Sequence, residues 1–585
     1  MHVVATAGHV DHGKSTLIRA LTGMEPDRWD EERRRGLTID LGFAWTRLPS
    51  GREIAFVDVP GHERFVGNML AGIGPVSAVM IVVAADEGWQ PQSEEHLEAI
   101  DALEVRHGLL VVTRRDLADP AAAAAQARER LATTSLRSVE TLSVSGVTGE
   151  GLDALRATLD RLVAALPAPD VEAPVRLWVD RAFTIRGRGT VVTGTLSAGT
   201  VAVGDELVLV PSGRRVRVRG LEALKAQRDR VGAVARVAVN LRGVGAGEVR
   251  RGHALLTPGR WLSTPAVDAR LRGAAPSDLP AWLTFHIGSA AVPARLRPLG
   301  ADTVRLTLAR ELPLRIGDRA LLRDPGRHRV PAGVTVLDVH PPGLVRRGAS
   351  RERARVLDSV TGVPDVADEL RRRRLVRRSE LVAMGVEPPA DPVHGQWFAD
   401  PAYWDDLKQR LTGLVSTHAQ QNQLDPGVPL EVARRALALP ELRLVEALVR
   451  PPLRVRNGKL YGPQAAPVLP AHAQQGIDAI RRDLAAAPFN APDANRLAAL
   501  GLTPRYLAAA AEAGALLRVA DGVFLLPGAD ESAAGVLAGL DQPFTASEAR
   551  QALGTSRRVA VPLLELLDAR GYTRRLDEAG RRRVR

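Results

Sequence analysis

The sequence predicts a multidomain protein: an amino-terminal α/β domain, two β-barrels, and then a chain of mostly helical winged-helix modules. Three changes of pattern along the chain predict this order. Residues 1 to about 168 alternate short apolar runs with amphipathic stretches, as in a parallel sheet covered by helices. Beyond the proline-rich stretch 166–174, apolar and polar residues alternate between glycine turns, which is typical of small barrels. From about 346 onward, two helical stretches followed by a short hairpin recur.

Composition excludes several classes of protein. A chain of 585 residues is too long for one hydrophobic core, and we expect about three to six domains. No apolar run reaches the roughly 18 residues of a membrane-spanning helix, and the start "MHVVATAGHV" lacks the regions of a signal peptide. The lack of cysteine excludes disulfides and thiolate metal sites. We therefore expect a cytoplasmic protein with no membrane partner.

Arginine dominates the charge of the chain. The formal net charge is +12, and the 79 basic residues include only four lysines, namely Lys14, Lys225, Lys408 and Lys459. The excess has two interpretations that composition does not separate: a general bias toward arginine codons, or a polyanionic partner. The positions of the basic residues must decide between them.

The first motif is "GHVDHGKS" at 8–15, between a predicted strand and a predicted helix. It matches the phosphate-loop pattern, in which backbone N–H groups and a helix amino terminus surround phosphate oxygens. Lys14 can reach the β- and γ-phosphates, and Ser15 can ligate Mg²⁺. A strand-to-helix turn without a ligand is the alternative. The predicted contacts here are Gly8, His9, Val10, Asp11, His12, Gly13, Lys14, Ser15 and Thr16.

Two further segments carry residues suited to Mg²⁺ and the γ-phosphate. "RGLTIDLGF" contains Thr38, whose hydroxyl can ligate Mg²⁺, although a polar loop threonine is the alternative interpretation. "DVPGH" ends a predicted strand, with Asp58 placed to hold Mg²⁺ through water and the Gly61 amide placed near the γ-phosphate. Ser15, Thr38 and Asp58 are thus the predicted metal-site residues.

The segment "TRRD" at 113–116 follows another predicted strand and indicates the base. Asp116 can accept hydrogen bonds from guanine N1 and N2, a donor pair that adenine lacks. Together with the preceding motifs it predicts an α/β P-loop GTPase domain that binds GTP or GDP with Mg²⁺. The predicted guanine-site residues also include Thr113, Arg114 and the loop Ser145, Gly146 and Val147.

These motifs resemble those of the translation-factor GTPases, through "GHVDHGKST", "RGLTID", "DVPGHERF" and "ADEGWQPQSEEHL". The resemblance implies that His62 positions the attacking water once the ribosome engages, and that Val10 belongs to its apolar surroundings. An exposed loop histidine is the alternative. "TRRD" departs from the family's N-K-x-D: Thr113 replaces the asparagine, with expected loss of the amide that ties this loop to the phosphate loop. Arg114 replaces the lysine, and its aliphatic stem can still stack on the base.

Within that group the chain looks most like the selenocysteine-specific elongation factors of the bacterial SelB type. "DRAFTIRGRGTVVTGT" is similar to the start of the domain that holds the aminoacyl end of tRNA. The resemblance covers nearly the whole chain and implies these domains: 1–170 for GTP binding; 174–258 and 262–345 for two β-barrels; and 346–405, 406–468, 470–528 and 529–585 for four winged helices.

The resemblance also implies a selenocysteine pocket formed by Asp180, Arg181 and Arg236. A selenol is anionic at neutral pH, so two guanidinium groups would favour it over the neutral serine hydroxyl. Asp180 would hold an arginine in place. The alternative is an ordinary barrel ion pair between Asp180 and one arginine.

The carboxy-terminal stretch 544–585 reads as a small module with a basic face. Thr545 can cap a helix with Glu548, and "GTSRR" opens a second helix whose amino terminus suits phosphates. "YTRRLDEAGRRRVR" would be the wing. The resemblance implies that this module binds a hairpin in messenger RNA, and a simple docking module is the alternative. The predicted RNA contacts are Ser556, Arg557, Arg558, Arg574 and Arg575.

The leading hypothesis is therefore a monomeric GTPase that delivers selenocysteinyl-tRNA to the ribosome at UGA codons marked by a messenger RNA hairpin. One rival is a general GTPase for aminoacyl- or initiator-tRNA, which would not need about 240 extra residues. Another rival, from a different class, is a GTP-regulated winged-helix protein that binds DNA.

Overall fold

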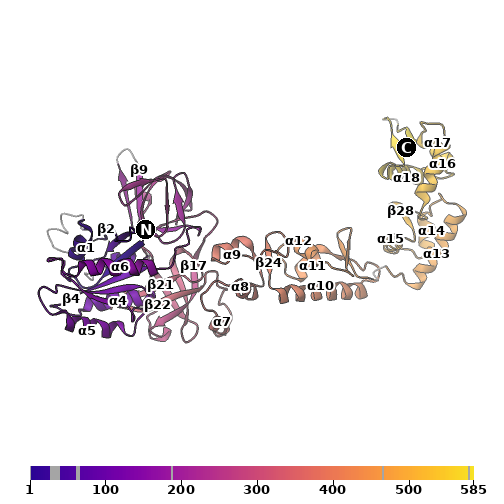
Figure 1. Cartoon of the computed structure of the whole chain (residues 1–585). Helices are drawn as coiled ribbons and strands as arrows, with labels where there is room; N and C mark the ends of the chain where they lie inside the picture. Colours follow the sequence, from indigo (N-terminus) through magenta and orange to yellow (C-terminus); the bar gives the residue numbers. More distant parts are fainter. Residues whose placement is uncertain are drawn as a thin grey trace. The chain divides into compact units, whose positions relative to one another are not determined.

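The computed structural model describes residues 2–26, 40–60, 66–74, 76–185, 189–327, 329–463, 467–577 and 580–584. The chain divides into two compact units, 1–390 and 391–585, and each is described by itself. Among the described residues, no helix is long and apolar enough to cross a membrane. Figure 1 shows the order of the elements along the chain.

The first domain is a mostly parallel sheet covered on both faces by helices. Its strands are β1 (His2–Ala7), β2 (Gly42–Arg47), β3 (Glu53–Asp58), β4 (Ala78–Ala84), β5 (Gly108–Thr113) and β6 (Glu140–Ser143), in the order β2-β3-β1-β4-β5-β6. Its helices are α1 (Lys14–Thr22), α3 (Val66–Ile73), α4 (Pro91–Ala102), α5 (Pro120–Leu131) and α6 (Leu152–Ala165). Every residue of β4 is buried, because apolar side chains fill both faces of a covered parallel strand.

Two separate cores lie on the two faces of this sheet. Leu17 of α1 and Leu159 of α6 pack in one core, while Leu97 of α4 and Ala127 of α5 pack in the other. The carboxyl ends of β1, β3 and β5 therefore lie at one edge of the sheet, where a nucleotide site is expected in this class of fold.

The second domain is a curled antiparallel sheet with its own apolar core. The main ladder runs β7-β16-β11-β12-β15-β9-β8. The strands are β7 (Arg176–Trp178), β8 (Arg181–Ile185), β9 (Gly189–Leu196), β10 (Thr200–Ala202), β11 (Glu206–Val210), β12 (Arg214–Ala223), β13 (Ala226–Arg228), β14 (Arg230–Gly232), β15 (Ala235–Arg242) and β16 (Ala254–Leu256); a short 3-10 helix, η2, spans Ala246–Glu248. The alternation of buried and half-buried residues along β15 is the period of two that predicted a barrel.

The third domain is a closed barrel in the order β17-β20-β19-β18-β21-β22. Its elements are β17 (Leu262–Gly273), η3 (Pro276–Asp278), β18 (Trp282–Ile287), β19 (Ala290–Pro298), β20 (Thr303–Leu314), β21 (Arg319–Asp324) and β22 (Arg329–Asp338). α4 of the first domain lies directly on β22, close enough that a Cβ on Gly333 would meet the Ala102 carbonyl at 2.3 Å. Ion pairs surround this contact: Arg272–Asp101, Arg319–Glu104, Arg323–Glu95 and Arg329–Glu98.

The first compact unit continues through α7 (Ala349–Asp358), α8 (Val366–Arg373), β23 (Leu375–Arg377) and α9 (Arg378–Met384). Buried Arg353 of α7 pairs with Asp268 and Asp338 of the closed barrel, which attaches α7 to that barrel. The boundary between the compact units, at 390/391, falls inside the predicted module 346–405.

The second compact unit repeats helices followed by a short hairpin. Its elements are β24 (Trp397–Ala399), α10 (Pro401–Gln421), β25 (Val428–Pro429), α11 (Leu430–Ala436), α12 (Leu442–Leu448), β26 (Arg454–Arg456), β27 (Lys459–Tyr461), α13 (Ala471–Ala486), α14 (Ala494–Ala499), α15 (Pro504–Glu512), β28 (Leu517–Ala520), β29 (Val523–Leu525), α16 (Ala529–Ala538), α17 (Ala546–Ala552), α18 (Arg557–Ala569), β30 (Thr573–Arg575) and β31 (Arg582–Val584). The hairpin pairs are β26–β27, β28–β29 and β30–β31.

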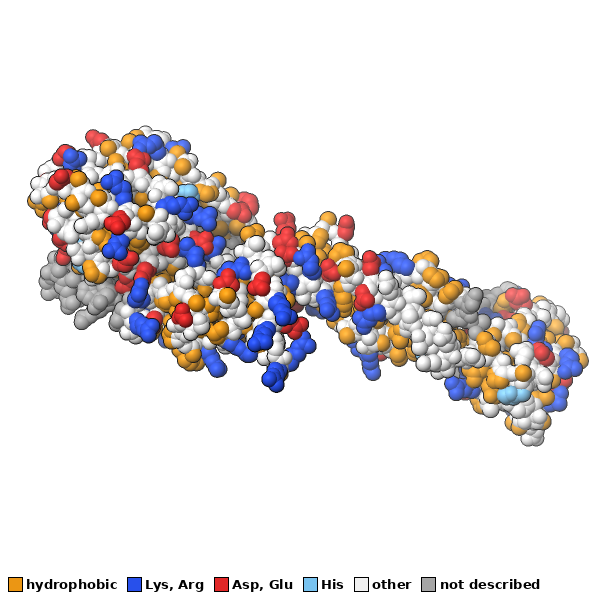
Figure 2. All heavy atoms as spheres, turned by 90° about the horizontal axis from the view of Figure 1, so that it is seen from below, with side chains coloured by type: hydrophobic (Ala, Val, Ile, Leu, Met, Phe, Trp, Pro, Cys, Tyr) orange, Lys and Arg blue, Asp and Glu red, His pale blue; other side chains and the backbone are white. Residues whose placement is uncertain are grey.

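Basic side chains are not confined to one element on the face that Figure 2 shows. Figure 2 shows lysine and arginine side chains across the visible faces, interspersed with acidic ones. Much of the net charge of +12 is therefore a general surface property, and only particular arginines can be assigned to sites.

Candidate functional site

The phosphate loop lies between β1 and α1, as predicted. Gly8 has φ +138°, and a Cβ there would lie 2.2 Å from the Val82 carbonyl, so only glycine fits. The Lys14 side chain is buried, and its Nζ donates to the carbonyls of Gly8 (3.0 Å) and His9 (2.5 Å). The backbone N–H groups of the first turn of α1 follow directly, which is the arrangement that binds phosphate groups.

The residues predicted for Mg²⁺ are together where the structure describes them. The Ser15 hydroxyl donates to Asp58 Oδ2 at 2.7 Å, and the Thr6 hydroxyl donates to Asp58 Oδ1 at 2.6 Å. Hydroxyl and carboxylate oxygens are the donors that Mg²⁺ prefers, so this pair fits the ion. The third predicted ligand, Thr38, lies outside the described residues, as do Gly61 and His62.

The base loop is joined to the phosphate loop in spite of its altered sequence. The Thr113 hydroxyl donates to the His12 carbonyl at 2.7 Å, inside the protein. The amide is absent, as expected from the sequence, but the Thr113 hydroxyl on a buried strand end reaches the same loop and ties the two loops together. Arg114 pairs with Asp86 and Glu87, at 2.9 and 2.7 Å.

The remaining base-site residues lie nearby. Asp116 is exposed just after β5. Ser145 is buried, and its hydroxyl accepts hydrogen bonds from the backbone N–H groups of Val147 and Thr148. A Cβ on Gly146 would lie 3.2 Å from the Thr16 methyl group, so this loop packs beside the start of α1.

Helix α4 supplies two contacts to the phosphate loop that the sequence did not predict. The Gly8 N–H donates to His96 Nδ1 at 3.0 Å, and the Val10 N–H donates to Gln92 Oε1 at 3.0 Å. Burial lowers the pKa of His96 to about 3, so the ring stays neutral and able to accept. Burial likewise lowers the pKa of His12 to about 4. No signal in the sequence predicted these contacts, because α4 also carries several other polar residues, among them Glu94, Glu95 and Glu98.

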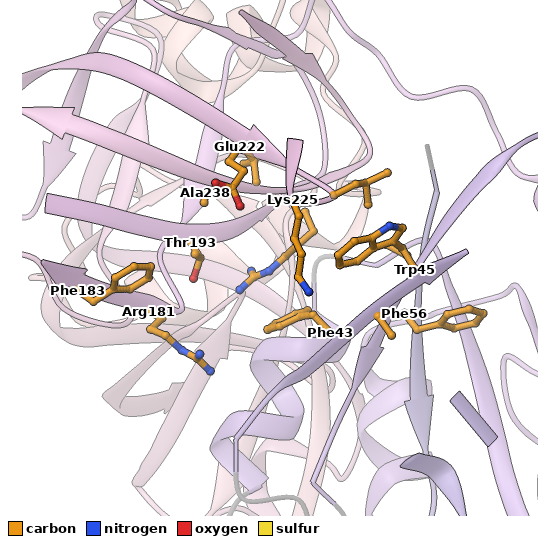
Figure 3. A pocket seen from close by; sticks show the side chains of 14 residues that line it. Phe43, Trp45, Phe56, Arg181, Phe183, Thr193, Glu222, Lys225 and Ala238 are labelled. Carbon is orange, nitrogen blue, oxygen red and sulfur yellow. The ribbon is translucent and has the colours of Figure 1, made fainter. Parts of the chain in front are cut away.

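A pocket of about 160 Å³ lies between β2 of the first domain and the second domain. We call it the interdomain pocket, and Figure 3 shows the side chains that line it. Phe43 and Trp45 come from β2. The second domain supplies Arg181, Phe183, Thr193, Lys225 and Arg236.

Two of the three predicted pocket residues, Arg181 and Arg236, line this pocket, and Asp180 contacts it through its ion pair with Arg236. Arg236 makes a two-bond ion pair with Asp180, which also accepts a hydrogen bond from the Thr193 hydroxyl at 2.7 Å. Arg181 instead donates to Asp40 of the first domain, at 2.5 Å. The Arg236 guanidinium carbon lies 3.9 Å from the centre of the Phe43 ring, so a cation–π contact crosses the domain boundary.

The carboxy-terminal module has the predicted caps and wing. Thr545 and Glu548 form a capping box, and Ser556 precedes α18. In the β30–β31 hairpin the backbones of Arg574 and Arg583 lie opposite each other. Ser556 and Arg557 are exposed at the amino terminus of α18, and Arg574 and Arg575 are exposed on β30.

One predicted RNA contact, Arg558, is exposed but also contacts the preceding module. The Arg558 guanidinium donates to the carbonyls of Gly522, Ala491 and Pro492, which belong to the preceding module. Arg558 therefore helps to hold two modules together, and three hydrogen bonds of its guanidinium lie within the protein. Arg582 is also structural: it is buried and pairs with Asp568 of α18.

Comparison with known proteins agrees with this arrangement. Residues 1–165 match the model of the elongation factor Tu GTP binding domain, residues 189–256 match that of elongation factor Tu domain 2, and residues 536–582 match that of the elongation factor SelB winged helix. A crystal structure of a bacterial selenocysteine-specific elongation factor superposes with a TM-score of 0.77 at 26% identity, covering 100% of both chains.

Two relatives show how far the similarity extends. The selenocysteine-specific elongation factor of Escherichia coli (strain K12) is 31% identical over 627 residues, covering 98% of this chain and 97% of that protein. That of Desulfomicrobium baculatum is 36% identical over 385 residues, covering 63% of this chain and 61% of that protein. The second alignment thus spans less than two thirds of the relative, whereas the first spans nearly all of it.

Proposed function

The chain belongs to the family of selenocysteine-specific elongation factors, and on this premise we propose that it is a GTPase that delivers selenocysteinyl-tRNA to the ribosome. The fold class and the GTP-binding domain predicted from the sequence are confirmed by the same comparisons. The proposed setting is the cytoplasm, and the proposed state is a monomer.

The first domain binds GTP and GDP and hydrolyses GTP. Lys14 and the N–H groups at the start of α1 would hold the phosphates, while Asp116 would select guanine. The hydroxyl of Ser15 and the carboxylate of Asp58 would hold Mg²⁺, which supplies neutralisation of charge on the phosphate oxygens. His62 is the proposed residue that orients the attacking water on the ribosome.

The interdomain pocket is the proposed site for the selenocysteine side chain. A selenolate would meet the guanidinium edge of Arg236, which Asp180 holds in a fixed orientation, and that of Arg181. Charge-assisted contacts of this kind favour an anion over the neutral hydroxyl of serine. The carboxy-terminal module would bind the messenger RNA hairpin through Ser556, Arg557, Arg574 and Arg575 and keep the factor close to its codon.

The observation that carries this function is the similarity over 98% of the chain to a selenocysteine-specific factor. The decisive experiment is a filter-binding competition, with GTP present, between selenocysteinyl-tRNA and other aminoacyl-tRNAs. We expect selenocysteinyl-tRNA to be strongly preferred. Equal binding of all aminoacyl-tRNAs would instead indicate a general elongation factor, and preference for duplex DNA without tRNA binding would indicate a regulator.

A further inference from the structure

We propose that Lys225 is a specificity-determining residue of the interdomain pocket, whose ammonium group supplies the charge that recognises an anionic selenolate. This inference rests on the proposed function and adds a residue to it. Lys225 lines the pocket beside Arg181 and Arg236, and its Nζ lies 5.2 Å from the centre of the Trp45 ring. Figure 3 shows its side chain directed from the barrel toward Phe43 and Trp45.

The first argument is the balance of charge. The two arginines of the pocket are each paired with a carboxylate, Arg236 with Asp180 and Arg181 with Asp40. The side chains of Asp180 and Arg236 are largely buried, at 8% and 13% exposed, and those of Arg181 and Asp40 are partly buried. Their guanidinium charges are therefore largely compensated before any cargo arrives.

Glu222 is the one carboxylate among the lining residues of the pocket, beside the three cations Arg181, Lys225 and Arg236. Asp40, Asp180 and a further cation, Arg251, interact with one another and with Arg181 next to the pocket. Of the three lining cations, Lys225 is the one with no carboxylate within ion-pair distance among the described residues. If its charge were removed, both lining arginines would still be paired with carboxylates, and Glu222 would repel a selenolate with no ammonium group in the lining to offset it. Since the walls include the rings of Phe43, Trp45 and Phe183, this repulsion would be weakly screened.

The second argument is the turn that presents the lysine. Lys225 and Leu224 form the two-residue turn between β12 and β13, where Ala223 pairs with Ala226. Both turn residues have positive φ, 52° for Leu224 and 57° for Lys225. Turns of this kind favour Asn-Gly, and each bulky L-residue costs roughly 1–2 kcal/mol there. Non-glycine residues in such conformations concentrate at functional sites.

Packing explains the residue type at only one of the two turn positions, Leu224. Its side chain packs against the core of the first domain, which explains why an apolar residue is kept at that position. Lys225 is exposed at the mouth of the pocket, and its ammonium group faces the Trp45 ring. Its conformation is therefore better explained by what its ammonium group faces.

The third argument is the choice of lysine in a chain that uses arginine nearly everywhere. Lys14 contacts loop carbonyls, Lys408 pairs with Asp405, and Lys459 pairs with Asp425. Lys225 faces an aromatic ring and a pocket instead. An ammonium group on a flexible stem can move toward a ligand, whereas the paired arginines of the pocket are held by their carboxylates.

The test compares Lys225→Met, which keeps the aliphatic stem, with Lys225→Arg, which keeps the charge. Equilibrium competition with GTP would measure the affinities for selenocysteinyl-tRNA and for seryl-tRNA carried on the same tRNA. We expect Lys225→Met to lower the preference for selenocysteinyl-tRNA by about tenfold, with seryl-tRNA affinity unchanged. Lys225→Arg should keep most of the preference.

The matched control is Lys408→Met, which removes a half-buried lysine from α10, far along the chain from the pocket, and should leave the preference intact. Unchanged GTP affinity would show that each variant is folded. An unaltered preference in Lys225→Met, or an equal loss for both cargoes, would overturn the role of Lys225. Absence of any preference in the unmodified protein would instead overturn the proposed function.

Discussion

Arg181 of the barrel donates to Asp40 of the first domain at 2.5 Å, and this pair connects the interdomain pocket to the chain that follows Thr38. The two side chains are only 25% and 30% exposed, so solvent screens them incompletely. The pocket arginine is thus attached to the domain that binds the nucleotide, two residues after a predicted ligand of Mg²⁺.

Replacing Asp40 by Asn should weaken this connection without removing the pocket. We expect the ratio of tRNA affinities in the GTP and GDP states to fall by about three- to tenfold, because one partly buried ion pair is lost. This ratio is obtained by measuring the tRNA affinity once with GTP and once with GDP. Arg52→Ala, which removes an arginine–aspartate pair elsewhere in the domain, is the matched control. An unchanged ratio in Asp40→Asn would mean that the pair only supports the fold.

Replacing Thr113 by Val should weaken nucleotide binding. The substitution keeps the shape of the side chain but leaves the buried His12 carbonyl without this donor. We expect GDP affinity to fall about tenfold, measured with a fluorescent nucleotide. Thr113→Ser keeps the hydroxyl and should bind almost normally. Equal affinities for Thr113→Val and the unmodified protein would contradict the role given to this bond.

Acid should destabilise the first domain through its buried histidines. His96 has a folded pKa of about 3 against an ordinary 6.5, so below pH 6.5 the unfolded chain binds protons that the folded chain does not. Stability is therefore present above pH 6.5 and declines as pH falls toward 3. His96→Asn keeps an acceptor for the Gly8 N–H and should make this decline shallower in denaturant titrations at several pH values. An identical pH dependence would refute the assignment.

His62→Ala should leave GTP binding intact and slow hydrolysis on ribosomes by about a hundredfold or more, because the attacking water would lose its orienting group. Single-turnover hydrolysis with programmed ribosomes measures the rate. His107→Ala, which changes a histidine outside the nucleotide site, should hydrolyse GTP normally. Normal turnover by His62→Ala would exclude the proposed role.

Neighbouring arginines of the last module should have opposite phenotypes. Arg558→Ala should lower the free energy of unfolding by about 1–3 kcal/mol, since its guanidinium holds three carbonyls of the preceding module. Arg557→Ala should leave stability within about 0.5 kcal/mol but weaken hairpin binding, most clearly at low salt. Urea titrations and RNA filter binding separate the two effects. The reverse pattern would exchange the roles assigned here.

The motifs could be predicted from the sequence because each is local. Phosphate-loop geometry depends on residues that are adjacent in the chain, and the strand-to-helix context of Lys14 was confirmed. The contacts of His96 with Gly8 and of Thr113 with His12 could not, because they join residues about 90 and 100 positions apart. Such pairs depend on which helix lies over which loop, and that is decided by packing of the whole domain.

At the carboxy-terminal end, residue type alone did not predict which side chains contact other parts of the protein. Arg557 and Arg558 are adjacent arginines in one motif, yet of the two only Arg558 donates to carbonyls of the neighbouring module. The same limit applied to Arg181 and Arg236, whose different carboxylate partners come from different domains. Charge patterns predict that a basic surface exists, but the direction of each side chain depends on its three-dimensional neighbours.

Helix α4 has one further consequence. Near its start it holds the phosphate loop through Gln92 and His96, and near its end Asp101 and Glu104 pair with arginines of the closed barrel. One helix thus contacts both the phosphate loop and the closed barrel, so a change in its tilt alters both contacts. Substitutions along α4 should change both contacts together, so that faster nucleotide exchange accompanies weaker attachment of the closed barrel to the first domain. Engineering either property separately would have to begin somewhere other than α4.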